Sequence, residues 1–252
     1  MAECLRLVSI NTWKCAGDYG ARMDVLERQL AALTPDVVAL QESFASVDGR
    51  HDTAARLARH LGMGLAFLPE RRKPRTVGSQ SFDSHSGLAV LSRLPIAAEH
   101  HLPLPSNAAD GGRSAQLLRL HWNGRQIVLG NIHLTHLDDG ALRQQQLACL
   151  LKHPWLTAAA DLALVCGDFN AGLDTPAMHA FLTTAGAWRD ACASVPDKRT
   201  FRTAGASRDL DHILIRADSR LVETGASVVL DGPDPATGVL ASDHCGVSAS
   251  FR

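Results

Sequence analysis

The sequence lacks the features that would assign it to several specialised protein classes. Its six cysteines are scattered, with no Cys-x-x-Cys pair, so neither a disulfide framework nor a zinc site is indicated. Cys4 and Cys166 lie within apolar runs and are expected to be buried thiols. No apolar run reaches the roughly 20 residues that span a bilayer, and residues 1–11 do not resemble a signal peptide. These absences predict a soluble, cytoplasmic protein with no transmembrane segment.

The sequence also lacks a surplus of charge and is poor in aromatic residues. Its formal net charge is −1, and aromatic residues make up 5% of the chain. Proteins that bind nucleic acid without sequence preference usually carry a basic surplus and aromatic side chains on which bases stack. The composition therefore weighs against a dedicated nucleic-acid binder, although it is compatible with a local basic patch.

Apolar residues are plentiful enough to form a substantial core. Of the 252 residues, 46% are hydrophobic, a share that is typical of globular proteins and not of disordered chains. The chain has no internal repeat and no low-complexity linker. We therefore expect residues 1–252 to form a single domain.

Apolar patterning predicts a mixture of hairpins and β-α-β units. Asn123-Gly124 between two strand-like runs is a strong hairpin signal. Such a mixture favours mixed sheets with helices packed outside them. The longest stretches without strand pattern, Arg71–Ser86 and Asp231–Ser242, are expected to be loops. Strands are expected at Leu5–Ile10, Val37–Gln41, Gly87–Leu91, Ala115–Trp122, Gln126–His133, Leu162–Cys166, Leu210–Ile215 and Cys245–Phe251, and helices at Ala21–Leu33, Thr53–Leu61, Ala141–Leu151 and Thr175–Thr184.

Polar residues recur where the predicted apolar strands end. A sheet can deliver such side chains to a shared cleft, so they are candidates for a functional site. Gly-Asp-Phe-Asn is the most specific of these segments, because glycine allows a tight turn and a close approach of the backbone to a ligand. Taken singly, each residue has an ordinary alternative: a surface carboxylate, a helix cap or a buried, hydrogen-bonded histidine. The candidates are Asn11, Glu42, His133, Asp168, Asn170, Asp211, Asp243 and His244.

Taken together and in order, these segments resemble a known family. The resemblance rests on N-T-W, L-Q-E, S-G-L-A-V-L-S-R-L-P-I (Ser86–Ile96), N-I-H-L, G-D-F-N, L-D-H-I and S-D-H, and it runs from Ser9 to His244. The segments are similar to those of the endonuclease/exonuclease/phosphatase superfamily, which includes deoxyribonucleases, sphingomyelinases, inositol phosphatases and tyrosyl-DNA phosphodiesterases. The resemblance implies a hydrolase of phosphate esters with an α/β fold. That fold is a four-layer α/β/β/α sandwich of two mixed β-sheets flanked by helices.

The resemblance also implies a magnesium site at one edge of the sandwich. Glu42 matches the family's metal-binding glutamate, and Asn11 matches its metal-site asparagine. Asp243 would support the site directly or through water. Hard oxygen ligands of this kind suit Mg²⁺, which keeps several waters and takes a phosphate oxygen. Mn²⁺ is the alternative cofactor.

The remaining matched residues are implied to carry the reaction. Asp168 matches the aspartate that orients or deprotonates the attacking water, and Asn170 would hold that water or a phosphate oxygen. His244 matches a phosphate-contacting histidine, and Asp211 matches the carboxylate that orients it. A nearby carboxylate raises the pKa of a histidine and so favours the cation that a phosphoryl group attracts. His133 matches a second phosphate-contacting histidine, which is also a possible proton donor to the leaving oxygen.

Several charged residues nearby have two interpretations. Arg113 either contacts a phosphate or is a solvated arginine at a strand start, and His136 either reaches the substrate or lies on the rim. His212 should point to the opposite face from Asp211 and is expected to be structural. The basic cluster Arg71–Arg75 is expected to be a solvated charge run, with a clamp for a remote phosphate as the alternative.

Three function classes compete on this sequence. The first, which we prefer, is a Mg²⁺-dependent phosphodiesterase acting on a small or lipid-like phosphodiester. The second is an endonuclease, exonuclease or DNA-repair phosphodiesterase that acts on nucleic acid. The third is a non-catalytic binding module on the same fold, which should have lost a site residue. Because the whole candidate set is present, the third class ranks last.

Overall fold

The computed structural model describes residues 4–137, 140–184, 188–203 and 205–252. One set of strands comprises β1 (Leu5–Asn11), β2 (Val37–Ser46), β3 (Gly64–Val77), β4 (Gln80–Ser92), β13 (Glu223–Val229) and β14 (Gly246–Phe251). A second set comprises β5 (Ile96–Leu104), β6 (Arg113–Trp122), β7 (Arg125–His133), β8 (Leu162–Asp168), β9 (Trp188–Asp190) and β12 (Asp211–Arg216). Two short strands, β10 (Phe201–Thr203) and β11 (Ala206–Arg208), pair with each other. The helices are α1 (Tyr19–Leu33), α2 (Thr53–Leu61), α3 (Gly140–Leu151), α4 (Pro154–Thr157) and α5 (Pro176–Thr184).

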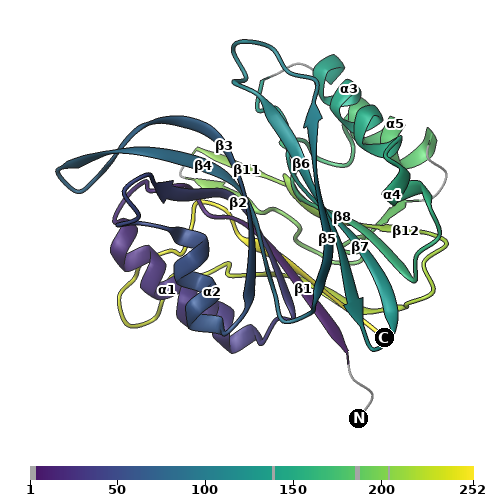
Figure 1. Ribbon diagram of the computed structural model, residues 1–252, viewed down its shortest axis with the longest axis horizontal. Coiled ribbons are helices and arrows are strands. Elements are labelled where there is room, and N and C mark those ends of the chain that lie inside the picture. Colours follow the sequence, from purple (N-terminus) through teal and green to yellow (C-terminus); the bar gives the residue numbers. More distant parts are fainter. Residues whose placement is uncertain (1–3, 138–139, 185–187, 204) are drawn as a thin grey trace.

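Two six-stranded sheets face each other, with helices outside both (Figure 1). The first sheet has the order β13-β14-β1-β2-β4-β3, and the second has the order β5-β6-β7-β8-β12-β9. Each contains a parallel pair, β1 with β2 and β7 with β8, among antiparallel neighbours. Both sheets are therefore mixed, and the predicted α/β/β/α sandwich is confirmed.

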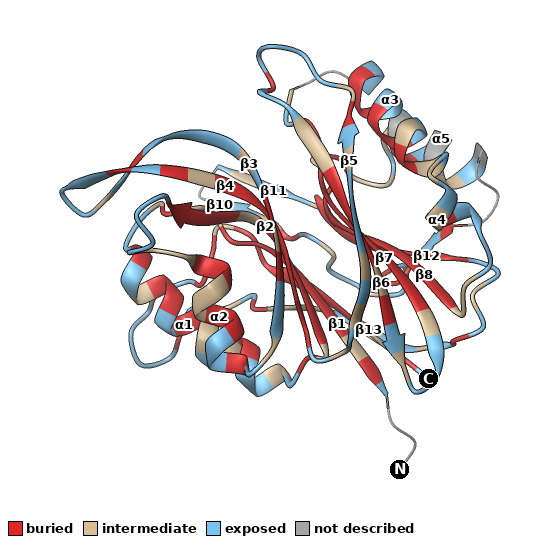
Figure 2. Cartoon of the chain, viewed as in Figure 1, coloured by how far each residue is buried: buried red, intermediate tan, exposed pale blue. Residues whose placement is uncertain are grey.

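Three apolar layers hold the sandwich together. Leu7 and Leu164 belong to the layer between the two sheets. Leu26 and Leu57 anchor α1 and α2 on the outer face of the first sheet, while Leu147 belongs to the layer beneath α3 and α5 on the second. Central strands are consequently buried along most of their length (Figure 2). Strands buried on both faces read as nearly continuous apolar runs, which is why the sequence revealed them.

Local signals in the sequence fix several element boundaries. The side chain of Asp52 accepts a hydrogen bond from the backbone N–H of Ala55 at the start of α2, and Gly62 ends that helix with a φ of 63°. Asn123 and Gly124 both have positive φ and join β6 to β7. The helix predicted over residues 53–61 and the predicted hairpin are therefore confirmed.

The prediction of a loop over Arg71–Ser86 is wrong. This segment forms much of the β3–β4 hairpin, which turns at Gly78 with a φ of 58°. The hairpin curves away from the body of the molecule (Figure 1), so most of its side chains face solvent and carry no alternating apolar pattern. The strands β5 and β13 were also missed, because they are edge strands with few buried residues. Pro103 lies in β5, where an edge position tolerates the missing N–H.

Three further expectations concern the burial of the cysteines, the segment 231–242 and the lengths of the helices. Cys166 is buried, as predicted, but Cys4 is exposed, because it precedes β1 instead of lying within it. Asp231–Ser242 contains no strand, as expected. Among the described residues, no helix has the length and apolar character needed to cross a bilayer.

Candidate active site

Strand pairing in the second sheet brings three predicted residues together. β7 runs parallel to β8, so His133 is the register partner of Asp168 where both strands end. β12 runs antiparallel to β8, so Asp211, its first residue, also pairs with Asp168. Directly paired residues project from the same face of a sheet. The topology therefore places these three side chains side by side.

The first sheet supplies the opposite wall. β14 is antiparallel to β1, so Asp243 and His244, which precede β14, lie near Asn11 at the end of β1. The hydroxyl of Ser242 donates to the backbone carbonyl of Asn11 at 2.6 Å and fixes this approach. Glu42 does not end its strand as expected but lies in a β-bulge of β2 with a φ of 54°. Bulges re-aim side chains, and this one directs Glu42 toward the pocket.

One pocket of about 430 Å³ collects most of the predicted residues. Asp211 does not line it and lies behind His244, against which it packs. His212 points elsewhere, to the carbonyl of Ala171, as expected for a structural residue. The predicted residues that line the pocket are Asn11, Glu42, Arg113, His133, His136, Asp168, Asn170, Asp243 and His244.

Both side-chain oxygens of Asp168 accept hydrogen bonds from residues of the pocket. Its Oδ2 accepts a hydrogen bond from the Asn11 side chain at 2.9 Å, and its Oδ1 accepts one from the backbone N–H of Asn170 at 2.8 Å. Burial and the neighbouring charge of Asp211 raise its pKa to about 6, while His244 and these hydrogen bonds oppose the rise. The group therefore is ionised at neutral pH yet can accept a proton.

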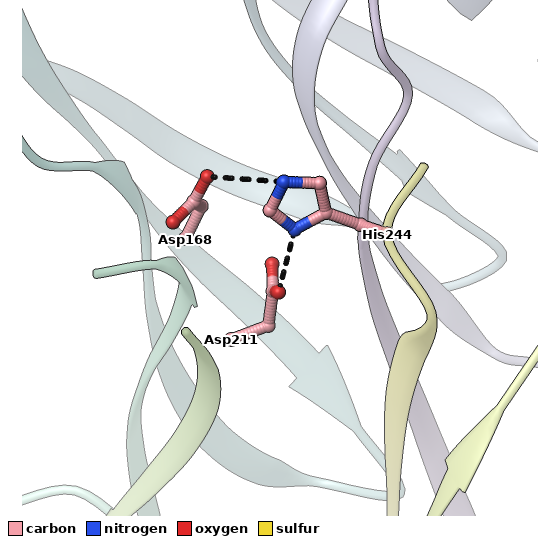
Figure 3. A group of neighbouring side chains, drawn as sticks. All are labelled: Asp168, Asp211 and His244. Carbon is pink, nitrogen blue, oxygen red and sulfur yellow. Dashed lines mark hydrogen bonds and ion pairs between the residues drawn. The ribbon is translucent and has the colours of Figure 1, made fainter. Parts of the chain in front are cut away.

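His244 lies between two carboxylates, as Figure 3 shows. Its Nδ1 is 2.8 Å from Oδ2 of Asp211, and its Nε2 is 3.9 Å from Oδ2 of Asp168. Burial alone would lower the pKa of this imidazole, but the charge and hydrogen bond of Asp211, together with Asp168 and Asp243, raise it to about 10. Thr200 donates to the same Asp211 oxygen at 2.6 Å and fixes its orientation. His244 is consequently a cation at neutral pH.

The pKa of His133 is shifted in the opposite direction to that of His244. Its Nε2 lies 3.4 Å from Oδ2 of Asp168. Burial, reinforced by the charges of Arg113 and Lys14, lowers its pKa well below the ordinary value. A neutral His133 can donate one N–H hydrogen bond, but it is a poor source of a proton.

Two sets of side chains could attract a cation. Asp168, Asp211 and His244 offer ligand atoms within 4.8 Å of one another, but His244 is protonated and Asp211 is already hydrogen-bonded to it and to Thr200. Hard oxygens of Glu42, Asn11 and Asp243 form the other set.

The Glu42 set fits a divalent ion better. The ammonium of Lys14 already contacts Glu42, which shows that this carboxylate attracts a cation. Burial raises the pKa of Asp243, and the charge of Glu42 adds to the rise against the opposing charge of His244. Two carboxylates that repel each other in this way suit a doubly charged ion with oxygen ligands.

A buried arginine holds the loop that carries Lys14. Trp13 and Lys14 both have positive φ, 55° and 48°, a conformation that costs energy in residues other than glycine. Arg22 donates hydrogen bonds to the carbonyls of Lys14 and of Ala241. Its guanidinium also lies 5.0 Å from the ring of Trp13. Arg22 therefore ties the β1–α1 loop to the segment that carries Asp243.

The rim carries Arg113 and His136, held by a buried aspartate. Nε of Arg113 lies 3.1 Å from Asp110, and Nδ1 of His136 lies 3.6 Å from the same oxygen. Arg113 also approaches the His136 ring at 3.2 Å. Both predicted residues thus line the pocket, with a fixed geometry that neither interpretation from the sequence had specified.

Glu70 is a further pocket carboxylate, which the sequence did not reveal. It accepts a hydrogen bond from the backbone N–H of Ser114 at 2.9 Å. Burial raises its pKa to about 7, against the opposing charge of Arg113. Because the ionised form is disfavoured in the folded state, Glu70 destabilises the fold progressively as pH rises from about 4.5 to 7.

Glu70→Gln should remove this pH-dependent cost and keep the hydrogen bond to Ser114. We expect the variant to gain stability relative to wild type as pH rises from 5 to 8, by about 2 kcal/mol. Denaturant titrations at pH 5, 6, 7 and 8 would measure it, and comparing the two proteins cancels all other titrations. A stability difference that does not change with pH would show that the pKa of Glu70 is not raised in the folded protein.

Several residues of the site could not be found from strand-end patterns. Lys14 directly follows the N-T-W segment, and its charge was the only available signal. Thr200 and Arg22 act through tertiary hydrogen bonds. Arg71, Lys73 and Arg75 line the pocket, so the expectation that the whole basic cluster is solvated is wrong, and Arg75 is in fact buried.

Solved structures of other proteins share the fold of this chain. The human nocturnin catalytic domain, solved with a bound sulfate, has a TM-score of 0.76 and 21% identity, covering 99% of this chain and 93% of that one. D. rerio TDP2, solved with a single strand DNA product, has a TM-score of 0.71 and 18% identity, covering 99% of both chains. A family protein from Leptotrichia buccalis C-1013-b has a TM-score of 0.74 and 18% identity, covering 98% of this chain and 99% of that one.

Similarity of this kind establishes a shared fold, and a sequence-family match goes further. No curated protein matches the chain. A family model described as the Endonuclease/Exonuclease/phosphatase family matches residues 8–244, nearly the whole sequence. This span contains every residue of the pocket described above. The chain therefore belongs to the endonuclease/exonuclease/phosphatase family.

Proposed function

We propose that this protein is a Mg²⁺-dependent phosphodiesterase whose reaction takes place in the pocket between the two sheets. The observation that carries the proposal is the pairing of a cationic His244 with an ionised Asp168 across that pocket. Hydrolysis of a phosphate ester requires a base for the water and positive charge for the phosphoryl oxygens. These two side chains supply one of each.

Asp168 is proposed to orient and deprotonate the attacking water. The hydrogen bonds from Asn11 and Asn170 hold its two oxygens in place. Since its pKa of about 6 lies below neutral pH, it is ionised and available as a base at neutral pH. Asn170, whose side chain donates to the carbonyl of Leu134 at 3.0 Å, borders the pocket and would contact the water or a phosphate oxygen.

His244 is proposed to bind a phosphoryl oxygen as a fixed cation. Asp211 and Thr200 hold the imidazole so that Nε2 faces the pocket. His133 would donate a neutral N–H to the same phosphate, because its lowered pKa disfavours the role of proton donor. Arg113 and His136 would bind the substrate from the rim.

Glu42, Asn11 and Asp243 are proposed to hold the divalent ion, Mg²⁺ or alternatively Mn²⁺. The ion would supply positive charge to the phosphate in the ground state and the transition state. Lys14 contacts Glu42 and would have to leave this carboxylate when the ion binds. Asp168 is then available for the water and His244 for the phosphate, while Asp211 holds the imidazole of His244 from behind.

Metal removal and Glu42→Gln test the proposal together. EDTA should abolish hydrolysis of bis-p-nitrophenyl phosphate, and Mg²⁺ should restore it. Glu42→Gln should raise the Mg²⁺ concentration needed for half-maximal activity by about tenfold or more, with little change in thermal stability. Glu223→Gln, on the distant edge strand β13, serves as the control. Full activity in excess EDTA would disprove the metal requirement.

For the substrate, a small or lipid-like phosphodiester is the first candidate. The pocket is compact, and the chain has no overall basic surplus. Nucleic acid is the second candidate, favoured by the D. rerio TDP2 structure with its single strand DNA product. Screening both classes with the purified protein and Mg²⁺ would separate them.

We also propose a reducing, cytoplasmic setting. Within the described residues no disulfide joins any two cysteines, and four of them, Cys15, Cys166, Cys192 and Cys245, are buried. Free thiols are the rule where glutathione and thioredoxin keep them reduced. Localisation of a tagged protein in its native cell would test this.

A further inference from the structure

Three cations of β3 face the pocket from one side. Lys73 and Arg75 alternate along the strand and therefore project from the same face, whereas Arg72 projects from the other. Arg71 joins them because it lies in a bulge, where Glu70 and Arg71 oppose the single residue Ser86. We call Arg71, Lys73 and Arg75 the cationic face; all three line the pocket.

The cationic face forms no ion pairs among the described residues, although the charge of Glu42 acts on Lys73 and Arg75 from a longer range. Arg72, on the opposite face, forms an ion pair with Asp83. In the described part of the chain, by contrast, no ion pair involves Arg71, Lys73 or Arg75. Of the four basic residues on β3, one therefore forms an ion pair and three do not.

Arg75 is a buried cation whose guanidinium forms no ion pair among the described residues. Only 8% of the residue is exposed, yet its hydrogen-bond acceptors are neutral oxygens, including the hydroxyls of Ser84 and Ser86. Its Nε is buried and has no partner. A buried charge is usually paired, because desolvation is costly. Here the positive charge lies next to a pocket and has no carboxylate among its hydrogen-bond acceptors, although the charge of Glu42 acts on it from a longer range.

Mutual repulsion adds to the cost. Burial lowers the pKa of Lys73, and the charges of Arg75 and Arg71 lower it further. Arg71 is also held in place, because its guanidinium packs on the 107–112 turn, where a Cβ at Gly111 would come within 3.2 Å of it. An anion bound among these side chains would relieve the repulsion and complete their hydrogen bonds.

We propose that the cationic face binds a second phosphate of the substrate, one that is not cleaved. The cleaved phosphate would lie at Asp168 and His244, while β3 carries the additional positive charge outward from the pocket along the curved hairpin (Figure 1). Substrates would then be phosphodiesters that bear at least one further phosphate. This inference rests on the proposed function and specifies its substrate class.

A matched pair of small substrates tests the proposal. Thymidine 5′-(p-nitrophenyl phosphate) carries only the phosphate to be cleaved, and its 3′-phosphorylated derivative carries a second. Wild type should prefer the derivative. Replacing Arg71 and Lys73 together by Gln should reduce this preference, expressed as the ratio of the two kcat/KM values, by about 10- to 100-fold, as expected for lost hydrogen bonds to charged groups. Arg72→Gln should leave the ratio unchanged.

Binding measurements distinguish failure of this inference from failure of the proposed function. Calorimetric titration with thymidine 3′,5′-bisphosphate and with thymidine 5′-phosphate requires no turnover. Wild type should bind the bisphosphate at least about tenfold more tightly, and the double variant should lose that advantage. If neither nitrophenyl substrate is hydrolysed but this pattern holds, the second-phosphate site stands and the proposed reaction fails. Equal affinity of wild type for both nucleotides, or an unchanged preference in the double variant, would overturn the inference.

A single-stranded oligonucleotide identifies the source of the second phosphate. If the substrate is a nucleic acid, the double variant should also flatten the salt dependence of oligonucleotide affinity, by about 0.7 in log–log slope per lost contact. If it is a small bisphosphorylated ester, the oligonucleotide should bind no more tightly than the bisphosphate. Either result supports the site.

Discussion

Asp168→Asn is expected to lower kcat by about 10²–10³-fold with little effect on KM. An amide cannot accept the proton of the attacking water. Its NH₂ group could also face the side-chain amide of Asn11, which now donates to Oδ2. These interactions matter mainly in the transition state, so the loss should fall on kcat. Steady-state kinetics on bis-p-nitrophenyl phosphate with saturating Mg²⁺ would measure it.

A second buried aspartate provides the control for this variant. Asp190 is buried in β9 and accepts a hydrogen bond from the backbone N–H of Cys192, but it does not line the pocket. Asp190→Asn should change kcat by less than about twofold. If Asp168→Asn kept more than about a tenth of the wild-type kcat, the proposed role of Asp168 as the base would be wrong.

Gly167→Ala is expected to destabilise the protein by more than about 3 kcal/mol. Gly167 has a φ of 138°, and a Cβ added there would lie 2.0 Å from the backbone oxygen of Ile132. Backbone atoms of the paired strands β7 and β8 cannot move apart without breaking their ladder. Since His133 and Asp168 directly follow these two residues, activity should fall as well. Denaturant unfolding of both proteins gives the stability difference.

Gly124→Ala separates the steric clash from backbone strain. Gly124 also has a positive φ, 74°, but nothing lies within 4 Å of an added Cβ. Its substitution should therefore cost only the strain of the left-handed conformation, about 1–2 kcal/mol. If both alanine variants lost the same stability, the close approach at Gly167 would not be the cause.

The sequence predicted the interior of this fold far better than its margins. Strands such as β8 are buried on both faces, and their apolar runs identify them without knowledge of their partners. The β3–β4 hairpin is different, because its strands are held by each other while their side chains face solvent or the pocket. Arg71–Ser86 therefore reads as a loop. Its three consecutive basic residues, Arg71, Arg72 and Lys73, and its small polar residues carry no period-2 apolar pattern.

In the candidate site, too, some residues could be predicted from the sequence and others could not. Asn11, His133 and Asp168 stand out because a polar residue that ends an apolar strand is unusual. Strand pairing then brings His133 to Asp168, and Asn11 reaches Asp168 from the other sheet through a hydrogen bond. Arg22 and Thr200 had no such signal. Their function depends on which carbonyl or carboxylate lies opposite, at separations along the chain that no local pattern encodes.

The position of β14 also determines when the protein can become active during synthesis. This strand lies between β13 and β1, and β13 has no other neighbour in the first sheet. A nascent chain that has not yet released residues 244–251 from the ribosome lacks both His244 and the strand that closes the sheet beside Asn11. Such non-local pairing forms late. Incomplete translation products that lack this strand should consequently show no phosphoesterase activity.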